Sequence, residues 1–247
     1  MRPRALLPVL AAALLPLVGA APAALPFGVG EELVFSMRSH RFGALGTGVM
    51  RVDGPEELRG ERAWLLRFDY RGRIGPVSAE DRTRSWLVPG RMSSLRYRKH
   101  ERTPLGSRSE EVELFPAERR WEAPGRASGR SPTDAPLDEL SFLYFLRTLP
   151  LRDGAVYTLD RHFDPERNPV VVRVVGRTRL SVPAGEFSTV EVVMEVKAPA
   201  HAKGKRGVVQ LHLTDDARRT PVRIESTAPL LGVVVLSLRS HTPAPGR

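Results

Sequence analysis

The sequence predicts a mainly β protein, built as a large curved antiparallel sheet or a partly closed β-barrel with one short buried helix at about residues 137–148. Short runs of alternating or β-branched apolar residues recur along the chain, separated by Gly, Pro and Asp turn residues. No amphipathic helical stretch lies between these runs, so a parallel α/β sheet is not expected. The apolar segment DELSFLYFLR, which begins at Asp138, is the exception that predicts the helix.

The expected strands follow one another at short spacing along the chain. Before the apolar segment they are Glu32–Arg38, Gly46–Val52, Ala63–Arg71, Asp81–Val88, Ser93–Thr103, Ser109–Phe115 and Arg119–Glu122. After it they are Val156–Phe163, Val170–Val182, Phe187–Lys197, Gly207–Thr214, Pro221–Thr227 and Gly232–Ser240. The stretch from Ala123 to Ala135 is rich in Gly, Ser, Pro and Arg, which is typical of a surface loop.

The predicted helix has a clear beginning and end. The N-cap is either Asp138, or Asp134 with Pro136 early in the first turn. Leu149-Pro150 stops the helix because the residue before proline avoids helical backbone angles. Apolar side chains surround most of the helix, so it is expected to be buried against the concave face of the curved sheet. There it either completes the core or forms one wall of a pocket.

The first residues resemble a secretory signal peptide. Arg2 and Arg4 precede an apolar run from Ala5 to Val18, which is followed by small residues. We therefore expect a signal peptide over residues 1–23 with cleavage near Ala20 to Ala24, a single β domain over 24–241 and a flexible tail over 242–247. The run is short for a membrane span, and no second hydrophobic segment follows it.

The absence of cysteine excludes disulfides, thiolate metal sites, cysteine nucleophiles and an anchor on a lipidated cysteine. The mature chain is thus expected to be a soluble exported or periplasmic protein, with no transmembrane segment after cleavage.

The formal net charge of +10 raises the question of a nucleic-acid partner. Only four of the 38 basic residues are lysine, and no nucleic-acid-binding motif accompanies the arginines. We therefore expect no nucleic-acid partner.

No motif predicts catalysis, a cofactor or a metal. The six histidines are scattered, and neither a His-Glu-x-x-His pattern nor a nucleophile elbow occurs. Asp215 and Asp216 suit a turn better than a carboxylate pair, because neighbouring strand residues point to opposite faces. His162 with Asp160 and Asp164 is a weak metal hypothesis, and a solvated strand face is the favoured interpretation.

The clearest charged element is RYRKHER, which begins at Arg96. A strand would place Arg96 and Arg98 on one face, and guanidinium groups beside an apolar concavity would suit an acidic amphiphile. The candidate ligand-facing residues are Arg96, Arg98, Phe142, Tyr144 and Phe145. The favoured alternative is that these arginines cover a solvent face and pair with Glu110, Glu111 and Glu113 on the next strand.

Five segments together resemble a known family. They are PFGVGEELVFSM from Pro26, GTGVMRV from Gly46, DELSFLYFLRTLPLRDG from Asp138, VPAGEFSTVEV from Val182 and LTDDARRTPVRIES from Leu213. In this order they resemble the exported bacterial family known as domain of unknown function 3108, although His212 stands where that family often has tryptophan. The resemblance implies an antiparallel β fold and an envelope setting, and it brings no catalytic residues.

These observations favour an uncharacterised exported, non-enzymatic protein that binds a hydrophobic or amphipathic envelope molecule, such as a lipid. The alternative is a structural or assembly partner of an envelope protein complex, acting through strand edges or the basic face. A hydrolase is the least favoured interpretation.

Overall fold

A computed structural model describes residues 24–104, 106–198, 207–228 and 231–246. The expected signal peptide, residues 1–23, lies outside these residues. Within them one antiparallel sheet has the strand order β8-β7-β6-β5-β4-β3-β2-β1-β14-β13-β12-β11-β10-β9. The predicted fold class is confirmed as a curved antiparallel sheet that does not close into a barrel.

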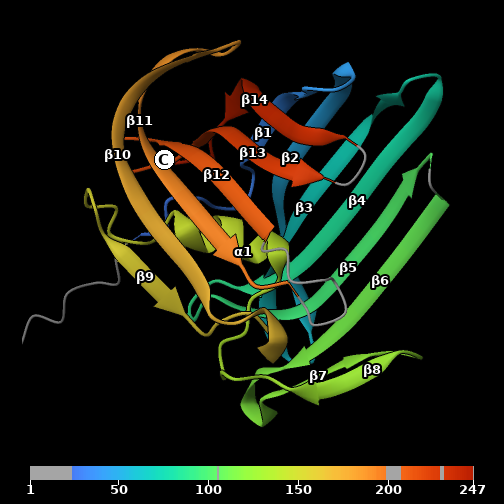
Figure 1. The fold of residues 1–247 in the computed structure, drawn as a ribbon. Coiled ribbons are helices and arrows are strands. Elements are labelled where there is room, and N and C mark those ends of the chain that lie inside the picture. The colour runs from blue at the N-terminus through green and yellow to red at the C-terminus, as the bar shows by residue number, and fades with distance from the viewer. Residues whose placement is uncertain (1–23, 105, 199–206, 229–230, 247) are drawn as a thin grey trace, which may run out of the picture.

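The sheet has two halves that meet where β1 pairs with β14. The N-terminal half comprises β1 (Glu32–Ser39), β2 (Gly43–Leu58), β3 (Glu61–Ile74), β4 (Val77–Val88), β5 (Ser93–Thr103), β6 (Gly106–Phe115), β7 (Arg120–Ala123) and β8 (Ala127–Arg130). The C-terminal half comprises β9 (Val156–Leu159), β10 (Val170–Val182), β11 (Gly185–Val196), β12 (Gly207–Thr214), β13 (Pro221–Ala228) and β14 (Gly232–Thr242). Both halves curve around α1 (Glu139–Leu146), the one α-helix among the described residues, as Figure 1 shows.

Helix α1 forms where the sequence predicts it, but it is shorter than residues 137–148. The Asp138 carboxylate accepts hydrogen bonds from the backbone N–H groups of Leu140 and Ser141, and Ser141 Oγ accepts from the backbone of Asp138. This reciprocal capping box satisfies donors that a helix N-terminus otherwise leaves unpaired. The helix ends at Leu146, just ahead of Pro150.

Irregular backbone bridges the open side of the sheet. The N–H of Ser94 on β5 donates to Pro136 O at 2.8 Å, and the N–H of Leu137 donates to Arg161 O at 2.7 Å. The Arg161 guanidinium fastens the same region by donating to Ala135 O. The strand expected over Val156–Phe163 therefore stops at Leu159, because the following residues form this bridge instead.

The loop expected over Ala123–Ala135 contains the strand β8, which forms a hairpin with β7. Gly125 takes a φ of 71° in the turn, a conformation that favours glycine. A Cβ on Gly129 would lie 2.9 Å from Trp121 Nε1, so the missing side chain lets the indole lie close to the β8 backbone. The polar composition of this segment did not predict a strand, because the side chain that packs on it, Trp121, belongs to β7.

The C-terminal half curls back on itself at the hairpin between β10 and β11. The backbone N–H of Ala184 at the hairpin turn donates to Leu238 O on β14 at 2.9 Å.

At the chain end, where we expected a flexible tail, Ala244 is buried and Pro245 lies against Gly30. These contacts join segments from both ends of the chain.

A buried ion pair connects α1 to the start of β1. The Arg147 guanidinium donates to both carboxylate oxygens of Glu31, at 2.7 and 2.8 Å, and the two side chains are 1% and 3% exposed. The same guanidinium donates to the backbone oxygens of Pro26 and Arg218, each at 3.0 Å. It also lies over the Phe27 ring, with 5.1 Å from Cζ to the ring centroid. One side chain therefore links the end of α1, the segment that leads into β1 and the turn after β12.

The environment of Glu31 favours its charged form. Burial acts to raise the pKa of this carboxyl, but hydrogen bonds from Arg147 and His241 outweigh burial and lower the pKa below its ordinary value of 4.5. Because the folded state holds Glu31 charged more strongly than the unfolded state does, the pair stabilises the fold above that ordinary pKa.

Replacing Arg147 with alanine is expected to lower the free energy of unfolding by about 3–5 kcal/mol, because Glu31 would remain buried without its partner. Urea denaturation followed by circular dichroism measures this loss. The exposed pair of Arg98 and Glu111 supplies the control, since Arg98→Ala should cost about 1 kcal/mol or less. Similar losses in the two variants would contradict a special role for Arg147.

The same pair predicts a pH dependence. The stability difference between the wild type and Glu31→Gln should be largest at neutral pH and shrink as the pH falls below 4.5 and through the lowered folded pKa of Glu31. Repeating the denaturation at a series of pH values tests this, and a constant difference would contradict it.

Tyr144 provides a second stability prediction, because its buried hydroxyl has no hydrogen-bond partner among the described residues. Tyr144→Phe should leave the free energy of unfolding unchanged or raise it by up to about 1 kcal/mol. In the matched variant Tyr70→Phe, loss of the hydroxyl bond to Leu45 O should instead cost about 1 kcal/mol. Equal effects in the two variants would show that the Tyr144 hydroxyl is satisfied in solution.

Candidate functional site

The predicted ligand-facing residues lie on opposite faces of the sheet. Successive residues of β5 alternate between faces. Tyr97 is buried on the inner face. Burial raises the pKa of its phenol well above the usual value, and the charges of Glu139 and Asp138 at the start of α1 raise that pKa further. Arg96 and Arg98 therefore point to the outer face, away from the helix.

Arg96 and Arg98 are both engaged on that outer face. Arg96 pairs with Glu113, and Arg98 Nη2 lies 2.5 Å from Glu111 Oε1. Both guanidinium groups also stack on Trp86, at 5.4 and 5.7 Å from the ring centroid. Pairing with glutamates of β6, the favoured alternative from the sequence, is thus present for both arginines.

The predicted residues of α1 lie in the interior. Phe142 and Tyr144 are each 1% exposed, and Phe145 is 9% exposed. Phe142 and Phe145 pack edge to face with ring centroids 6.0 Å apart, and Tyr144 packs in the same way on Phe27 at 4.9 Å. These side chains belong to one apolar core that both halves of the sheet share.

The outer face of the N-terminal half carries a row of arginines that run across four strands. Arg51 on β2 lies directly opposite Arg67 on β3, Arg67 lies opposite Arg84 on β4, and Arg84 lies opposite Arg98 on β5. Glu32 on β1 and Glu111 on β6 stand at the two ends. We call these four arginines the arginine row.

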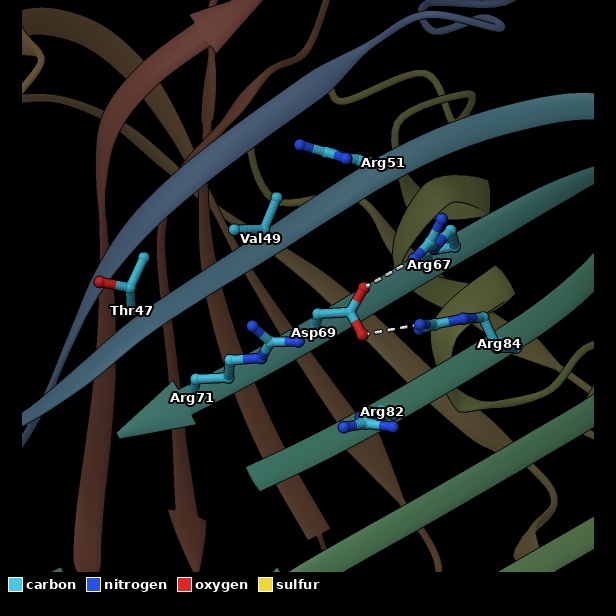
Figure 2. A pocket seen from close by; sticks show the side chains of 8 residues that line it. All are labelled: Thr47, Val49, Arg51, Arg67, Asp69, Arg71, Arg82 and Arg84. Carbon is cyan, nitrogen blue, oxygen red and sulfur yellow. Dashed lines mark hydrogen bonds and ion pairs between the residues drawn. The ribbon is translucent and has the colours of Figure 1, made fainter. Parts of the chain in front are cut away.

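A groove of about 450 Å³ lies over this part of the outer face. Its lining contains five arginines and a single carboxylate. These residues are Thr47, Val49, Arg51, Arg67, Asp69, Arg71, Arg82 and Arg84. Figure 2 shows Arg67 and Arg84 both directed at Asp69, with the other arginines arranged around them. We call this the arginine groove.

The acidic groups near the groove are shared or lie at its edge. Asp69 accepts from Arg84 at 2.7 Å and also lies 3.5 Å from Arg67, which pairs with Asp53 at 3.0 Å. Arg71, by contrast, is exposed and forms no ion pair with any residue that the structure describes.

Like charges that stand directly opposite each other on neighbouring strands destabilise a sheet. Neighbouring strands are about 4.8 Å apart, so each arginine of the row repels the arginine opposite it on the adjacent strand. Exposed partners offset only part of this repulsion. An added negative charge would offset the repulsion that remains beside the carboxylate partners of the row, which are Glu32, Asp53, Asp69 and Glu111.

One end of this outer face is covered. The Arg59 side chain at the turn between β2 and β3 donates to the backbone oxygens of Leu95 and Leu114, each at 2.7 Å. This contact brings the hairpin over β5 and β6, where Leu58 and Leu65 pack with Trp86 in a small separate apolar cluster. The arginine groove lies on the part of the face that this hairpin leaves open.

His162, the residue behind the weak metal hypothesis, is buried beside the start of α1. Its Nδ1 accepts a hydrogen bond from the backbone N–H of Asp164, and its Nε2 lies 3.8 Å from Glu139 Oε1. Burial acts to raise the pKa of Glu139, but His162 and the charge of Arg167 outweigh burial and lower it. Across the described ranges, no group of three or more His, Asp or Glu side chains is arranged to hold a metal ion.

Sequence reasoning identified only part of the groove. The predicted strand Asp81–Val88 places Arg82 and Arg84 on one face, and this alternation is the part of the groove that the sequence makes visible. Arg51, Arg67 and Arg71 were missed, because their approach to the other arginines depends on strand register. The register shifts between Asp53 and Glu56 in the pairing of β2 with β3, and such shifts are not visible in the sequence.

The family profile of proteins of unknown function DUF3108 matches residues 34–239. This chain belongs to the DUF3108 family. Among the curated proteins, none matches it.

Three solved structures match the chain at low sequence identity and low TM-score. An exported protein of provisional assignment with a YmcC-like fold from Bacteroides fragilis has 11% identity and a TM-score of 0.38, covering 88% of this chain and 98% of its own. A provisionally assigned lipoprotein from Parabacteroides distasonis has 11% identity and a TM-score of 0.34, with coverages of 90% and 100%. A DUF1089 family protein from Pseudomonas aeruginosa has 10% identity and a TM-score of 0.32, with coverages of 74% and 90%. At these TM-scores the likenesses carry no functional argument.

Three of the segments that resemble the DUF3108 family meet at the scaffold, whereas GTGVMRV from Gly46 contributes Thr47, Val49 and Arg51 to the lining of the arginine groove. Glu31 and Arg147 form the buried ion pair, while Asp138 and Ser141 cap the helix. The segment from Leu213 provides the backbone oxygen of Arg218 that accepts from Arg147. The DUF3108 motifs in this chain therefore explain how the helix is fixed inside the sheet.

Proposed function

We propose that this DUF3108 protein is a non-catalytic binding protein for an anionic molecule of the cell envelope, and that the arginine groove holds the charged group of that molecule. The observation that carries the proposal is the arginine row, in which four guanidinium groups face one another across four strands. Export to the envelope rests on the signal-peptide pattern of the first residues.

The chemistry of the groove favours a ligand with more than one negative charge, such as a phosphate or diphosphate group. Arginine donates through a planar fork that matches phosphate oxygens, and its charge persists at all physiological pH values. Neighbouring strands lie about 4.8 Å apart, so arginines on two strands can donate to one such group. Binding would relieve the repulsion within the arginine row.

The same site suits the headgroup of an amphipathic molecule. Val49 lines the groove, and Val34 lies opposite it on β1, so apolar surface adjoins the arginines. The aromatic side chains of α1 fill the interior of the sheet, as the burial of Phe142 and Tyr144 indicates. We therefore place the binding of an envelope amphiphile on the outer face instead of in the concavity.

Removing one groove arginine should weaken anion binding about tenfold, because a hydrogen bond to a charged group contributes about 1.5–3 kcal/mol. Isothermal titration of the purified protein with inorganic diphosphate, and separately with a short-chain phosphatidic acid, measures this effect for Arg71→Gln and Arg82→Gln. Binding of both probes indicates phosphate recognition, whereas binding of the lipid alone would show that the acyl chain is also required.

The matched control is Arg179→Gln, which alters a highly exposed arginine of β10 in the other half of the sheet. This variant should bind both probes like the wild type. Raising the salt concentration should weaken binding by the wild type, because exposed charges are screened. No binding of either probe, or equal losses in the groove and control variants, would refute the proposal.

A second candidate is an assembly role, favoured by the open edge of β10. Only Val170–Arg173 of this strand pair with β9, whereas the strand continues to Val182. In the part of the chain that the structure describes, no strand covers the remaining edge, and such an edge can accept an extended segment of another protein.

Site-specific photo-cross-linking tests this second candidate in the intact cell envelope. A cross-linking residue at Ser181, on the open edge, should yield one discrete protein adduct, whereas Ser78, at a turn in the other half, should yield none. The same adducts from both positions, or none from Ser181, would rule out a partner at this edge.

A further inference from the structure

Two hairpin turns at one end of the N-terminal half each expose a large apolar side chain. Phe42, in the turn between β1 and β2, is 42% exposed, and Val77, beside the turn between β3 and β4, is 44% exposed. Gly46 on β2 pairs with Gly72 on β3. Because the two strands are antiparallel, the start of β2 and the end of β3 lie at the same end of the sheet. The two turns therefore lie at the same end of the sheet (Figure 1).

Hydrogen bonds hold both turns in place. Ser39 Oγ accepts from the backbone N–H groups of Arg41 and Phe42, at 3.0 and 2.9 Å. At the other turn, Arg73 Nη2 donates to Pro76 O at 2.6 Å. The fold thus presents Phe42 and Val77 to the surroundings on ordered turns, although water solvates such side chains poorly.

Positive charge surrounds the two apolar side chains. We call residues 38–45, 71–80, 101–104 and 106–109 the hairpin end. It contains two half-buried glutamates, Glu80 and Glu101, and six arginines, all of them exposed: Arg38, Arg41, Arg71, Arg73, Arg102 and Arg108. Arginine side chains can keep their charge among lipid headgroups while their apolar stems lie deeper.

We propose that the hairpin end docks on the surface of a lipid bilayer that contains anionic lipids. Interfacial binding needs apolar side chains that enter the boundary between headgroups and acyl chains, together with basic residues that meet anionic headgroups. Phe42 and Val77 supply the first requirement, and the six arginines supply the second. Two separate apolar tips are too small for a stable protein interface, which buries about 800 Å² on each partner.

The hairpin end and the arginine groove share Arg71, but the docking does not rest on the ligand proposed for the groove. The groove lies along the outer face of β2, β3 and β4, whereas Phe42 and Val77 stand at the turns and do not line it. Variants at these two positions leave every arginine of the groove in place. The two proposals can therefore fail separately.

Vesicle co-sedimentation of the full mature chain tests the docking. The wild type should bind vesicles of phosphatidylcholine mixed with phosphatidylglycerol and should bind vesicles of phosphatidylcholine alone several-fold more weakly. Phe42→Ser should weaken binding to the mixed vesicles by about tenfold, because the variant lacks the apolar side chain that the bilayer would remove from water. Val77→Ser should weaken it to a smaller extent, in line with its smaller side chain.

The matched control is Val175→Ser, because Val175 is 55% exposed on β10 in the other half of the sheet. It should bind mixed vesicles like the wild type. All three variants should titrate diphosphate as the wild type does, and a loss of that binding would indicate misfolding, which circular dichroism checks independently. Equal binding to both vesicle types, or equal effects of Phe42→Ser and Val175→Ser, would overturn the proposal.

Discussion

The buried pair of Arg147 and Glu31 is the interaction on which the rest of the structure depends. Removing two charges from water is unfavourable, and the pair persists because both terminal nitrogens of the guanidinium donate to acceptors and the group lies over the Phe27 ring. It fixes the C-terminal end of α1 against the chain that enters β1 and against the turn after β12. The helix is consequently tied to the inside of the sheet at its C-terminal end.

The filled interior is the reason why the proposed binding site lies on the exterior of the sheet. The aromatic residues of α1 occupy the concave side, so the strands present their second set of side chains outward, and on β2 to β5 that set is largely arginine. The apolar side chains of the same strands stabilise the fold while their neighbours in sequence carry charge. A β-strand allows this separation because adjacent residues face opposite sides.

The sequence predicted the elements of this fold better than it predicted their contacts. Asp138 and Leu149-Pro150 marked the helix because capping and proline effects are local. The strand at Ala127–Arg130 was missed because Trp121, on another strand, supplies the contact that Gly129 lacks. The arginine row was missed for a similar reason, since register depends on irregularities such as the shift between Trp86 and Leu87 in the pairing of β4 with β5.

The pairing of the first strand with the last has a consequence for how the molecule forms. Glu32 lies opposite Thr242, so the seam between the two halves joins residues from nearly opposite ends of the chain. Closing so long a loop has a large entropic cost, and proteins dominated by such distant contacts fold slowly. The seam cannot form until β14 has been synthesised and released. Until then the two halves can form only the pairings between strands that are neighbours in sequence, so the complete sheet depends on the last strand to emerge.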